Sequence, residues 1–416
     1  IVNPTSELSE TISWRIRTLH KHLEYEPEWW QDQDGDWHMR FAPKRNAGNL
    51  FDFRYLIIEE SSMVDLLLYE KIWDAMRPGT VIIFIGDINQ LPPVFGKSIF
   101  NYALHQLPVI ELTQVYRQAE DSGIIQNAHR ILDGQPPIKN HDTEIMYPKE
   151  AAKVKISQAR LGMSLGKPGG FFHKQYLSGA YNPETDVILS PWNKHEMGTN
   201  MMNARIAQFL GDERKAEVFE IIAGRRKCYL ALGDQVFIDK QLGKIVEIAV
   251  NGGYVGRLPN PSSVDLLRVG QYRIGAGGGS HDFELTGYEN IDVDEIADED
   301  KKNQASHIVR VKLLDDDSDT PFTMELQAAG DFAQQKFSLG YCLTVHKSQG
   351  CEWRKVYILL HEEHTTKGNF VSRELLYTAC TRAREKLVLI AEDKVLEKGV
   401  KNQIIKGKTL DEKIAF

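Results

Sequence analysis

Two short apolar runs, residues 55–58 and 81–85, each end in a cluster of small or polar residues. Both runs are unbroken and rich in isoleucine and valine, which is typical of parallel strands buried on both faces. A helical pattern at 64–76 separates them and ends before Pro78-Gly79. The order strand, helix, strand predicts an α/β fold with a parallel sheet, in which ligands bind beyond the carboxyl ends of the strands.

The residues that follow these runs are of the types that an ATP-hydrolysing site requires. Glu59 and Glu60 follow the first run, and Asp87 and Gln90 follow the second within Gly-Asp-Ile-Asn-Gln-Leu-Pro-Pro-Val. Adjacent side chains point in different directions, so one glutamate can serve Mg²⁺ while the other orients water. A glutamine can donate to a phosphate oxygen and accept from a water. The alternative, a solvated strand end, is disfavoured by the second motif.

A second polar group, Thr344-Val345-His346-Lys347-Ser348-Gln349-Gly350, follows another predicted strand. Its hydroxyl, imidazole and amine groups suit a phosphodiester backbone, and Gly350 permits close approach. Glu352 comes next and could bind a ribose hydroxyl; the alternative is an ordinary turn. Arg117 and Arg382 are candidate arginine fingers, because a guanidinium on the terminal phosphate stabilises the charge of the transition state. The alternative for either arginine is a surface charge.

Composition excludes several other classes of protein. A chain of 416 residues is expected to form two to four domains, and 42% hydrophobic with 26% charged residues is ordinary for a globular protein. No apolar run approaches the roughly 18 residues of a membrane span. The four cysteines are scattered, which favours a reduced, cytosolic protein. The net charge of −8 argues weakly against nucleic acid, although an acidic chain can still hold a basic groove.

The chain divides by pattern into two α/β segments and a junction. Residues 1–135 are expected to form the first domain, and 184–416 the second. Between them, residues 136–183 are irregular and rich in Gly, Pro and Lys, as expected of a linker. The first residues, Ile1-Val2-Asn3-Pro4-Thr5, resemble the end of a buried strand, so further sequence is expected upstream.

Three further elements complete the expected organisation. Asp34-Gly35 between aromatic-rich arms predicts a β-hairpin at 28–41. Its Trp37 could wedge between nucleic-acid strands, or the aromatic side chains could simply pair across the hairpin. A strand is expected at 109–112. Short alternating strands between 233 and 326 predict a small inserted β-barrel.

In the order of these motifs the chain resembles the RecD/Dda-like helicases of superfamily 1, subclass B. The segments similar to that family's motifs Ia, II, III, IV, V and VI are, in order, residues 3–5, 57–63, 86–94, 112–118, 343–352 and 377–384. Residues 18–25 are similar to a further DNA-contacting motif. The resemblance implies two RecA-like P-loop NTPase motor domains, with a β-hairpin pin in the first and an SH3-like β-barrel in the second. ATP would lie between the motor domains and single-stranded DNA across them.

The resemblance also implies roles for individual residues. Glu60 would be the general base, Gln90 the phosphate sensor, and Arg117 and Arg382 would reach the phosphates. The expected contacts to ATP and Mg²⁺ are Glu59, which also binds the metal, Asp87, Gln349, Gly350 and Glu352. The expected DNA contacts are Pro4, Thr5, His20, Trp37, Thr344, His346, Lys347 and Ser348.

The implied activity is ATP-driven movement in the 5′ to 3′ direction on single-stranded DNA, with unwinding of duplex DNA. Expected partners are single-stranded and fork DNA, with a single-strand-binding protein or a replisome component as further candidates, and no membrane. A monomer in the cytoplasm is expected, which would be the host cytoplasm for a phage-encoded protein.

Two features depart from the family pattern. The family has Asp where this chain has Glu59, so the longer side chain must retract or hold Mg²⁺ through water. No Gly-x-x-x-x-Gly-Lys-Ser/Thr occurs in the sequence. Gly96-Lys97-Ser98 lacks the upstream glycine, and we expect the phosphate loop before Ile1.

Two other functions therefore stay open beside a helicase. One is a non-catalytic or split-gene nucleic-acid-binding remnant of such a helicase, and an upstream phosphate loop would distinguish the two. The other is a P-loop ATPase of another class. The second is disfavoured because residues similar to motifs V and VI occur in the same chain.

Overall fold

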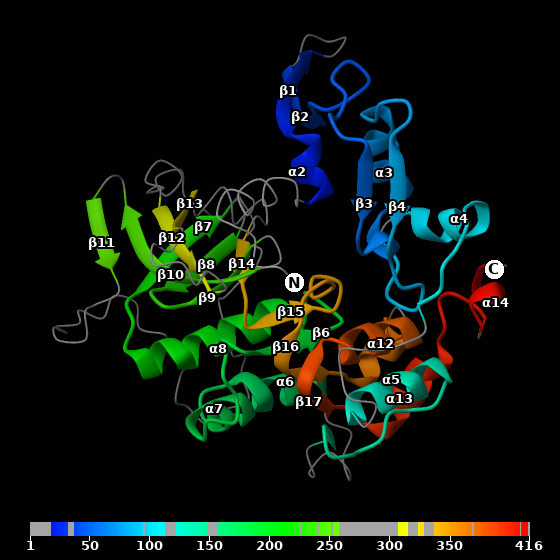
Figure 1. The fold of residues 1–416 in the computed structure, drawn as a ribbon. Coiled ribbons are helices and arrows are strands. Elements are labelled where there is room, and N and C mark those ends of the chain that lie inside the picture. The colour runs from blue at the N-terminus through cyan, green and yellow to red at the C-terminus, as the bar shows by residue number, and fades with distance from the viewer. Residues whose placement is uncertain are drawn as a thin grey trace, which may run out of the picture. The chain divides into compact units, whose positions relative to one another are not determined.

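The computed structural model describes residues 18–31, 37–94, 96–112, 122–147, 157–223, 226–238, 241–250, 253–257, 307–314, 323–327, 337–367, 370–407 and 409–414. They form two compact units (Figure 1). Unit 1 comprises residues 1–113 and 405–416, and unit 2 comprises 114–404. The division therefore falls earlier than the boundary expected at 135, and the end of the chain returns to unit 1.

Unit 1 contains the predicted strand, helix and strand. β3 (Tyr55–Ile58) and β4 (Val81–Phe84) pair in parallel, and α3 (Leu66–Asp74) connects them in sequence. Asp65 begins the helix, because its carboxylate accepts a hydrogen bond of 2.8 Å from the N–H of Leu68. A short 3₁₀ turn (Ser61–Met63), α4 (Ile99–Gln106) and α14 (Leu410–Ile414) complete the part of this unit around the strand ends.

Only one face of the β3–β4 pair is covered by the described residues. Leu56 and Ile58 are buried in the core with Ile72 of α3. The alternate side chains are exposed by 45% or more: Tyr55, Ile57, Val81 and Ile83. The prediction that both faces are buried is therefore wrong for the described residues, because unbroken apolar sequence does not by itself supply a second covering layer. This apolar face of unit 1 is thus not covered by any residue that the structure describes.

The predicted hairpin is present as an antiparallel pair. β1 (Tyr25–Gln31) and β2 (Trp37–Pro43) pair from Tyr25 opposite Pro43 to Gln31 opposite Trp37. The turn that joins them lies outside the described residues. Preceding β1 is α2 (Leu19–Leu23), whose first turn is capped by Thr18.

The strand expected at 109–112 is not formed. Residues 108–112 have no regular secondary structure, and Ile110 and Leu112 are each 86% exposed. The prediction was wrong because β-branched residues favour a strand only where a neighbouring strand offers hydrogen bonds, and no described strand pairs with this segment.

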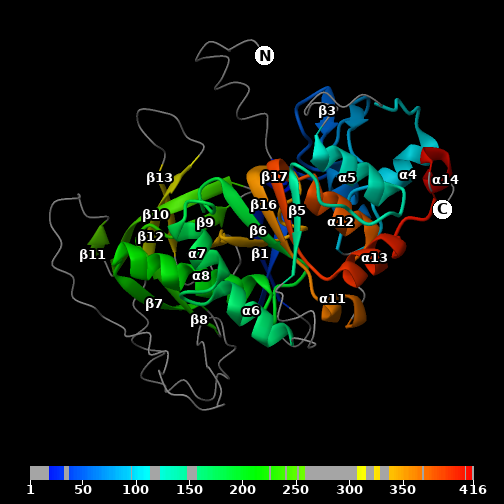
Figure 2. The same cartoon turned by 90° about the horizontal axis from the view of Figure 1, so that it is seen from below.

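Unit 2 is built on a parallel sheet with strand order β15-β6-β16-β17-β5 in the described residues. Their bounds are Cys342–Thr344 (β15), Asp186–Ser190 (β6), Trp353–Leu359 (β16), Ala383–Ile390 (β17) and Thr143–Met146 (β5). α6 (Gln158–Gly166), α7 (Phe171–Leu177) and α8 (Thr199–Arg214) lie on one side of this sheet. α5 (Gly123–Leu132), α12 (Arg373–Cys380) and α13 (Asp393–Lys401) lie on the other, as Figures 1 and 2 show. A short helix, α11 (Glu362–Thr366), follows β16.

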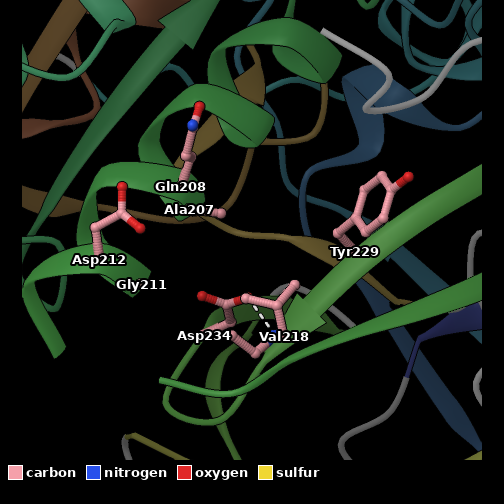
Figure 3. Close-up of a pocket in the computed structure, with 8 residues that line it drawn as sticks. Ala207, Gln208, Gly211, Asp212, Val218, Tyr229 and Asp234 are labelled. Carbon is pink, nitrogen blue, oxygen red and sulfur yellow. Dashed lines mark hydrogen bonds between the residues drawn. The ribbon is translucent and has the colours of Figure 1, made fainter. Parts of the chain in front are cut away.

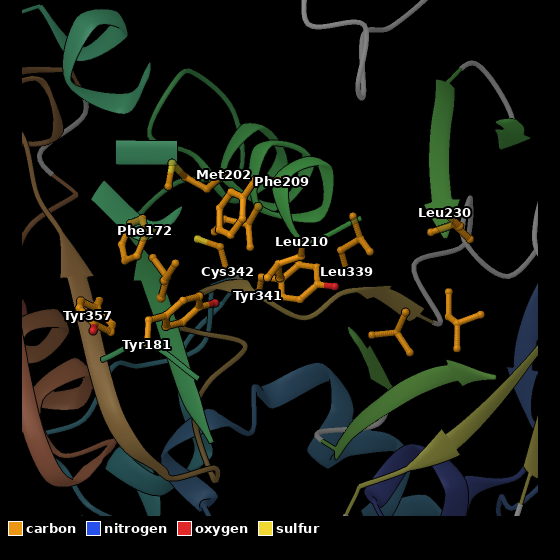
Figure 4. Close-up of a cluster of buried hydrophobic side chains, with 14 of the residues drawn as sticks. Phe172, Tyr181, Met202, Phe209, Leu210, Leu230, Leu339, Tyr341, Cys342 and Tyr357 are labelled. Carbon is orange, nitrogen blue, oxygen red and sulfur yellow. The ribbon is translucent and has the colours of Figure 1, made fainter. Parts of the chain in front are cut away.

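β5, α6 and α7 occupy the segment that was expected to be an irregular linker. That prediction was wrong because several glycines of this segment lie at the ends of helices. Gly166 is the last residue of α6, and Gly170 caps α7. Phe172 of α7 is fully buried and packs on Tyr181 and Tyr357, with ring centroids 5.7 and 5.2 Å away (Figure 4). The segment is therefore part of the core of unit 2.

In the described residues of the expected insertion there is an antiparallel sheet, with order β13-β12-β10-β9-β14 and β11 paired to β10. Its closure into a barrel stays a prediction. The strands are β9 (Gln235–Ile238), β10 (Gln241–Val250), β11 (Gly253–Arg257), β12 (His307–Leu313), β13 (Thr323–Gln327) and β14 (Phe337–Leu339). The sheet extends to Leu339, beyond the expected end at 326. A further antiparallel pair, β7 (Val218–Ala223) with β8 (Arg226–Ala231), was not predicted.

Candidate functional site

Glu60, at the end of β3, has surroundings that fit a catalytic role. Its backbone is left-handed, with φ 51° and ψ 39°, a conformation that is unfavourable for a non-glycine residue. Ser61 anchors it, since its N–H donates to the carbonyl of Ile85 at 2.9 Å. Atom Oε2 of Glu60 is buried and has no hydrogen-bond partner among the described residues. Because an unpaired buried carboxylate oxygen is unfavourable, the position is suited to a ligand that the described residues do not supply.

The loop after β4 brings Gln90 to the same end of the sheet. The carboxylate of Asp87 accepts from the N–H of Asn89 at 2.8 Å, and its carbonyl accepts from the N–H of Gln90 at 3.1 Å. Gly86 lets the loop approach its neighbour, because a Cβ there would lie 3.1 Å from the backbone nitrogen of Ser62. Oε1 of Gln90 is also buried without a partner among the described residues. Adjacent loops thus each present one unpaired side-chain oxygen.

Glu59 differs from Glu60 because its side chain is exposed. In the described parts of the chain, no group of three His, Cys, Asp or Glu side chains could hold a metal ion. Glu59 is thus a single exposed carboxylate that could serve Mg²⁺ together with oxygen ligands of other kinds, such as water and phosphate. Mg²⁺ is commonly held in this way beside nucleotides, so the hard oxygen donors present at this strand end fit the ion. One carboxylate oxygen of Asp87 already accepts a hydrogen bond from the N–H of Asn89 within the turn.

In unit 2 the loop of residues 344–350 follows β15. Thr344 pairs with Ser190 of β6, so the ends of these two strands are neighbours. The hydroxyl of Thr344 accepts from the N–H of Lys347 at 3.2 Å, which closes the first turn of the loop. His346 and Lys347 are half-buried, and burial lowers the pKa of both side chains. The imidazole is thus mainly neutral near pH 7 and offers both a donor and an acceptor.

Ser348 and Gln349 of this loop, which were predicted to contact DNA and nucleotide, differ from His346 and Lys347 in their burial. Ser348 and Gln349 are buried, and the hydroxyl of Ser348 donates to the carbonyl of Val345 at 2.8 Å. A side chain in that position shapes the turn rather than reaching a ligand. Gly350 is exposed with φ +79°, which a glycine adopts without strain. Thr344, His346 and Lys347 stay as candidates for phosphate contacts, and a DNA contact of Ser348 stays a prediction that its engaged hydroxyl does not favour.

Arg382 is held at the end of α12 by three acceptors. Its guanidinium donates to the carbonyls of Thr378 and Cys351 and to the hydroxyl of Thr381, each at 3.1 Å. The residue is only 6% exposed. A guanidinium has five N–H groups, so these contacts fix its orientation and use three of them. Arg382 thus joins the 377–384 motif to the 343–352 motif.

Glu352 forms an ion pair with the exposed Arg384, with Nε 3.3 Å from Oε2. Its carboxylate is thus engaged by the neighbouring strand β17. A contact of Glu352 to a ribose hydroxyl stays a prediction that requires sharing this carboxylate.

The remaining predicted contacts are only partly placed. His20 lies on α2 with its ring 5.6 Å from the ring of Tyr25, and partial burial and the charge of Lys71 lower its pKa. Trp37 is the first residue of β2. Pro4, Thr5 and Arg117 lie outside the described residues.

An aromatic cluster at the end of β6 was given no role by the sequence patterns. The ring of Trp192 lies 4.5 Å from that of His364 and 5.5 Å from that of Phe370. Burial lowers the pKa of His364 to about 3, so this imidazole stays neutral. A signal that could have located the cluster is Trp192, which follows the apolar run of residues 187–189 in Val-Ile-Leu-Ser-Pro-Trp.

A small pocket of unit 2 contains none of the predicted site residues. It lies between α8 and the β7–β8 pair, and Figure 3 shows seven of its labelled residues: Ala207, Gln208, Gly211, Asp212, Val218, Tyr229 and Asp234. Elsewhere, none of the described helices reaches the length and hydrophobicity needed to cross a lipid bilayer.

Comparisons with known proteins agree with the motifs. Residues 339–390 match the UvrD-like helicase C-terminal domain, and residues 3–149 match an AAA domain. The chain is 27% identical over 384 residues to the ATP-dependent RecD2 DNA helicase of Deinococcus radiodurans, which covers 91% of this chain and 40% of that protein. It is 50% identical over 403 residues to the RecBCD enzyme subunit RecD of Buchnera aphidicola, which covers 84% of this chain and 56% of that protein.

The chain thus spans between two fifths and just over half of the length of these curated relatives. Among solved structures, a Pif1 helicase from Bacteroides in complex with ADP-AlF3 and ssDNA is similar to 92% of this chain and 80% of its own, with a TM-score of 0.45 and 16% identity. The order of the motifs, the matched domains and the RecD relatives agree with one another. By its motifs, its matched domains and its relatives, this chain is related to the RecD-like helicases of superfamily 1.

Proposed function

We propose that this chain is the motor part of an ATP-dependent DNA helicase that moves 5′ to 3′ on single-stranded DNA and unwinds duplex DNA. The observation that carries the proposal is the placement of Glu60 and Gln90 on adjacent loops, each with a buried oxygen that has no partner among the described residues. A carboxylate that takes a proton from water and an amide beside the terminal phosphate are groups that ATP hydrolysis uses.

The proposed roles at the nucleotide follow from these positions. Glu60 orients and deprotonates water, and Gln90 senses the terminal phosphate. The exposed Glu59 serves Mg²⁺ through water, and the ion when bound neutralises phosphate charge. Arg117 and Arg382 stabilise the charge of the transition state, with further contacts from Asp87, Gly350 and Glu352. Gln349, whose side chain is buried, contributes by supporting its loop.

The proposed DNA contacts are divided between the two units. In unit 1 they are Pro4, Thr5, His20 and Trp37, and in unit 2 they are Thr344, His346 and Lys347. Hydroxyl, imidazole and ammonium groups bind phosphate oxygens without regard to base sequence, as a motor that moves along DNA requires. The β1–β2 pair would act as a pin at a fork, and the inserted sheet as an SH3-like barrel.

Single-stranded and fork DNA are the proposed partners of a monomeric motor, and replication, recombination and repair would all use one. A single-strand-binding protein or a replisome component would be a further partner.

The proposal is tested by measuring ATP hydrolysis with and without single-stranded DNA. The protein that also carries a phosphate-binding segment should be stimulated clearly, because DNA orders the loops that contact the phosphates. The 416-residue chain alone should bind nucleotide poorly in a direct titration, because it lacks the backbone cradle for the phosphates.

A stimulation below about twofold would contradict the helicase, because lid and loop closure on a substrate normally changes turnover by more than this. The non-catalytic remnant is the second candidate, favoured by the missing phosphate loop. It predicts DNA binding without nucleotide binding even when the native upstream sequence is present.

Trp37→Ala tests the pin. Unwinding of fork DNA should slow more than translocation on single-stranded DNA, because the ring would stack on a base only at the junction. Trp73→Ala is the control, since it removes a tryptophan that lies on α3 and is 60% exposed. Equal losses of unwinding and translocation in Trp37→Ala would mean that the hairpin is not a wedge.

A further inference from the structure

Asp234 is a buried carboxylate in unit 2 that no part of the proposed mechanism uses. It is 1% exposed and lies between β8 and β9. Its Oδ1 accepts from the guanidinium of Arg214 at 2.7 Å and from the hydroxyl of Tyr341 at 3.0 Å. Its Oδ2 accepts from the N–H of Ala231 at 2.8 Å. We call Arg214, Asp234 and Tyr341 the Asp234 clasp; Figure 3 shows Asp234 beside α8.

The hydroxyl of Tyr341 acts both as a hydrogen-bond donor and as an acceptor. It donates to Asp234 and accepts from the N–H of Gln235 at 3.0 Å. Burial, and then the charge of Asp234, raise the pKa of Tyr341, so the hydroxyl keeps its proton. Burial also raises the pKa of Asp234, while the charge of Arg214 opposes that shift. A buried carboxylate with a cation and two further donors is well satisfied, and removing one donor leaves buried groups without partners.

The clasp lies where the chain enters and leaves the inserted sheet. β9 is the first strand of that sheet and β14 the last, and they pair with Val236 opposite Leu339. Asp234 immediately precedes β9, and only Gly340 separates Tyr341 from β14. Gly340 allows the crossing to be tight, because a Cβ there would lie 3.0 Å from the carbonyl carbon of Val236. The clasp therefore closes the base of the inserted sheet.

Tyr341 also belongs to the parallel sheet that carries the 344–350 loop. Its carbonyl accepts from the N–H of Ile188 in β6 at 3.1 Å. The next residue, Cys342, exchanges two hydrogen bonds of 2.8 Å with the side chain of Asn203 in α8. Thr344 ends the same strand and begins the loop. The inserted sheet and the loop are thus joined through one very short stretch of backbone.

We propose that the Asp234 clasp is a positioning device through which the inserted sheet sets the conformation of the 344–350 loop, and with it the affinity for single-stranded DNA. The part of this inference that concerns affinity for DNA rests on the proposed function, and the part that concerns the loop conformation does not. Arg214, Asp234 and Tyr341 are positioning residues, since none of them is placed at a phosphate or a base. Because β14 and β15 are joined by two residues, a rotation of the inserted sheet must either break the clasp or move Thr344.

Tyr341→Phe in the full-length protein is the test, and the chain offers a closely matched control in Tyr181→Phe. Both tyrosines are 1% exposed and belong to the same core, as Figure 4 shows. The hydroxyl of Tyr181 has no hydrogen-bond partner among the described residues. Each variant therefore removes one buried hydroxyl, but only Tyr341→Phe removes hydrogen bonds that belong to the clasp.

Two measurements are expected to separate the variants. In Tyr341→Phe, the concentration of single-stranded DNA that gives half-maximal ATPase stimulation should rise about three- to tenfold, the equivalent of one hydrogen bond, while turnover at saturating DNA stays unchanged. Amide exchange at Ser348 and Cys351, which donate within the loop at 3.1 and 3.0 Å, should become faster. Tyr181→Phe should change neither quantity. Asp234→Asn combined with Tyr341→Phe should be less than additive.

The inference is overturned if Tyr341→Phe and Tyr181→Phe have the same DNA dependence and the same loop exchange, whatever their melting temperatures. The clasp would then be structural only. If the unsubstituted protein shows no stimulation by DNA, the proposed function fails instead. The exchange comparison at Ser348 and Cys351 then decides the inference by itself.

Discussion

Replacement of Glu60 by glutamine is expected to lower the turnover number for ATP hydrolysis by about 10²–10⁴-fold, the usual contribution of a general base. Glutamine has nearly the same shape as glutamate, but its amide cannot take a proton from water. Nucleotide affinity should be kept, because it depends on the phosphate-binding segment and on Mg²⁺. The melting temperature should not fall, since the substitution removes a charge whose buried Oε2 has no partner among the described residues. Steady-state hydrolysis and a nucleotide titration of the full-length protein measure both effects.

Glu59→Gln is the matched control for Glu60→Gln, because it removes the neighbouring carboxylate from an exposed position. It should raise the Mg²⁺ concentration needed for half-maximal activity and leave turnover at saturating Mg²⁺ nearly unchanged. Glu59→Asp, which restores the acid common in the family, should lower that Mg²⁺ requirement. Normal turnover in Glu60→Gln would refute its role as the base.

Replacement of Arg382 by alanine is expected to lower ATP hydrolysis by about 10³-fold or more, the effect of losing an arginine finger. Its contacts to Thr378, Cys351 and Thr381 occupy one N–H on each of the three nitrogens. One N–H on each terminal nitrogen is not used by these contacts, and this pair can meet phosphate oxygens side by side. Arg382→Lys should recover little activity, because an ammonium group cannot hold the acceptors and a phosphate together.

Arg384→Ala is the control for Arg382→Ala. Arg384 lies two residues further along the same motif, but its side chain is exposed, and its partner among the described residues is Glu352 in an ion pair. Exposed pairs of this kind contribute little, so activity should change by only about threefold or less. If the two alanine variants lost activity equally, the loss would reflect the motif as a whole, and Arg382 would not be the finger. Single-turnover hydrolysis with saturating ATP separates these outcomes.

The α/β elements of both units were predictable because their sequence patterns are local. Residues 55–58 and 81–84 form parallel strands as expected, and α3 lies between them. In unit 2, the strand expected before residues 344–350 is present as β15. The placement of Glu60 and Gln90 on neighbouring loops also followed, since the carboxyl ends of paired parallel strands meet at one edge of the sheet.

The predictions failed where contacts with residues distant in the sequence, and not the local sequence pattern, determine the structure. Residues 109–112 have the composition of a strand, yet no described strand pairs with them. Residues 158–177 were expected to be irregular because of their glycines. Two of these glycines instead end α6 and cap α7, and both helices are buried against α8. Ser348 has the chemistry of a phosphate contact, but its hydroxyl bonds to Val345 inside the turn.

The sequence by itself determined the family, the parallel α/β class and the residue types at the two strand ends, because these depend on short motifs and on the period of apolar residues. Only the tertiary structure decided which of these groups lack a partner. It left Oε2 of Glu60 and Oε1 of Gln90 buried and unpaired among the described residues, and it placed Arg382 against three acceptors. It also joined Arg214, Asp234 and Tyr341, which lie far apart in the chain, since hydrogen bonding of a buried charge is settled by packing and not by sequence order.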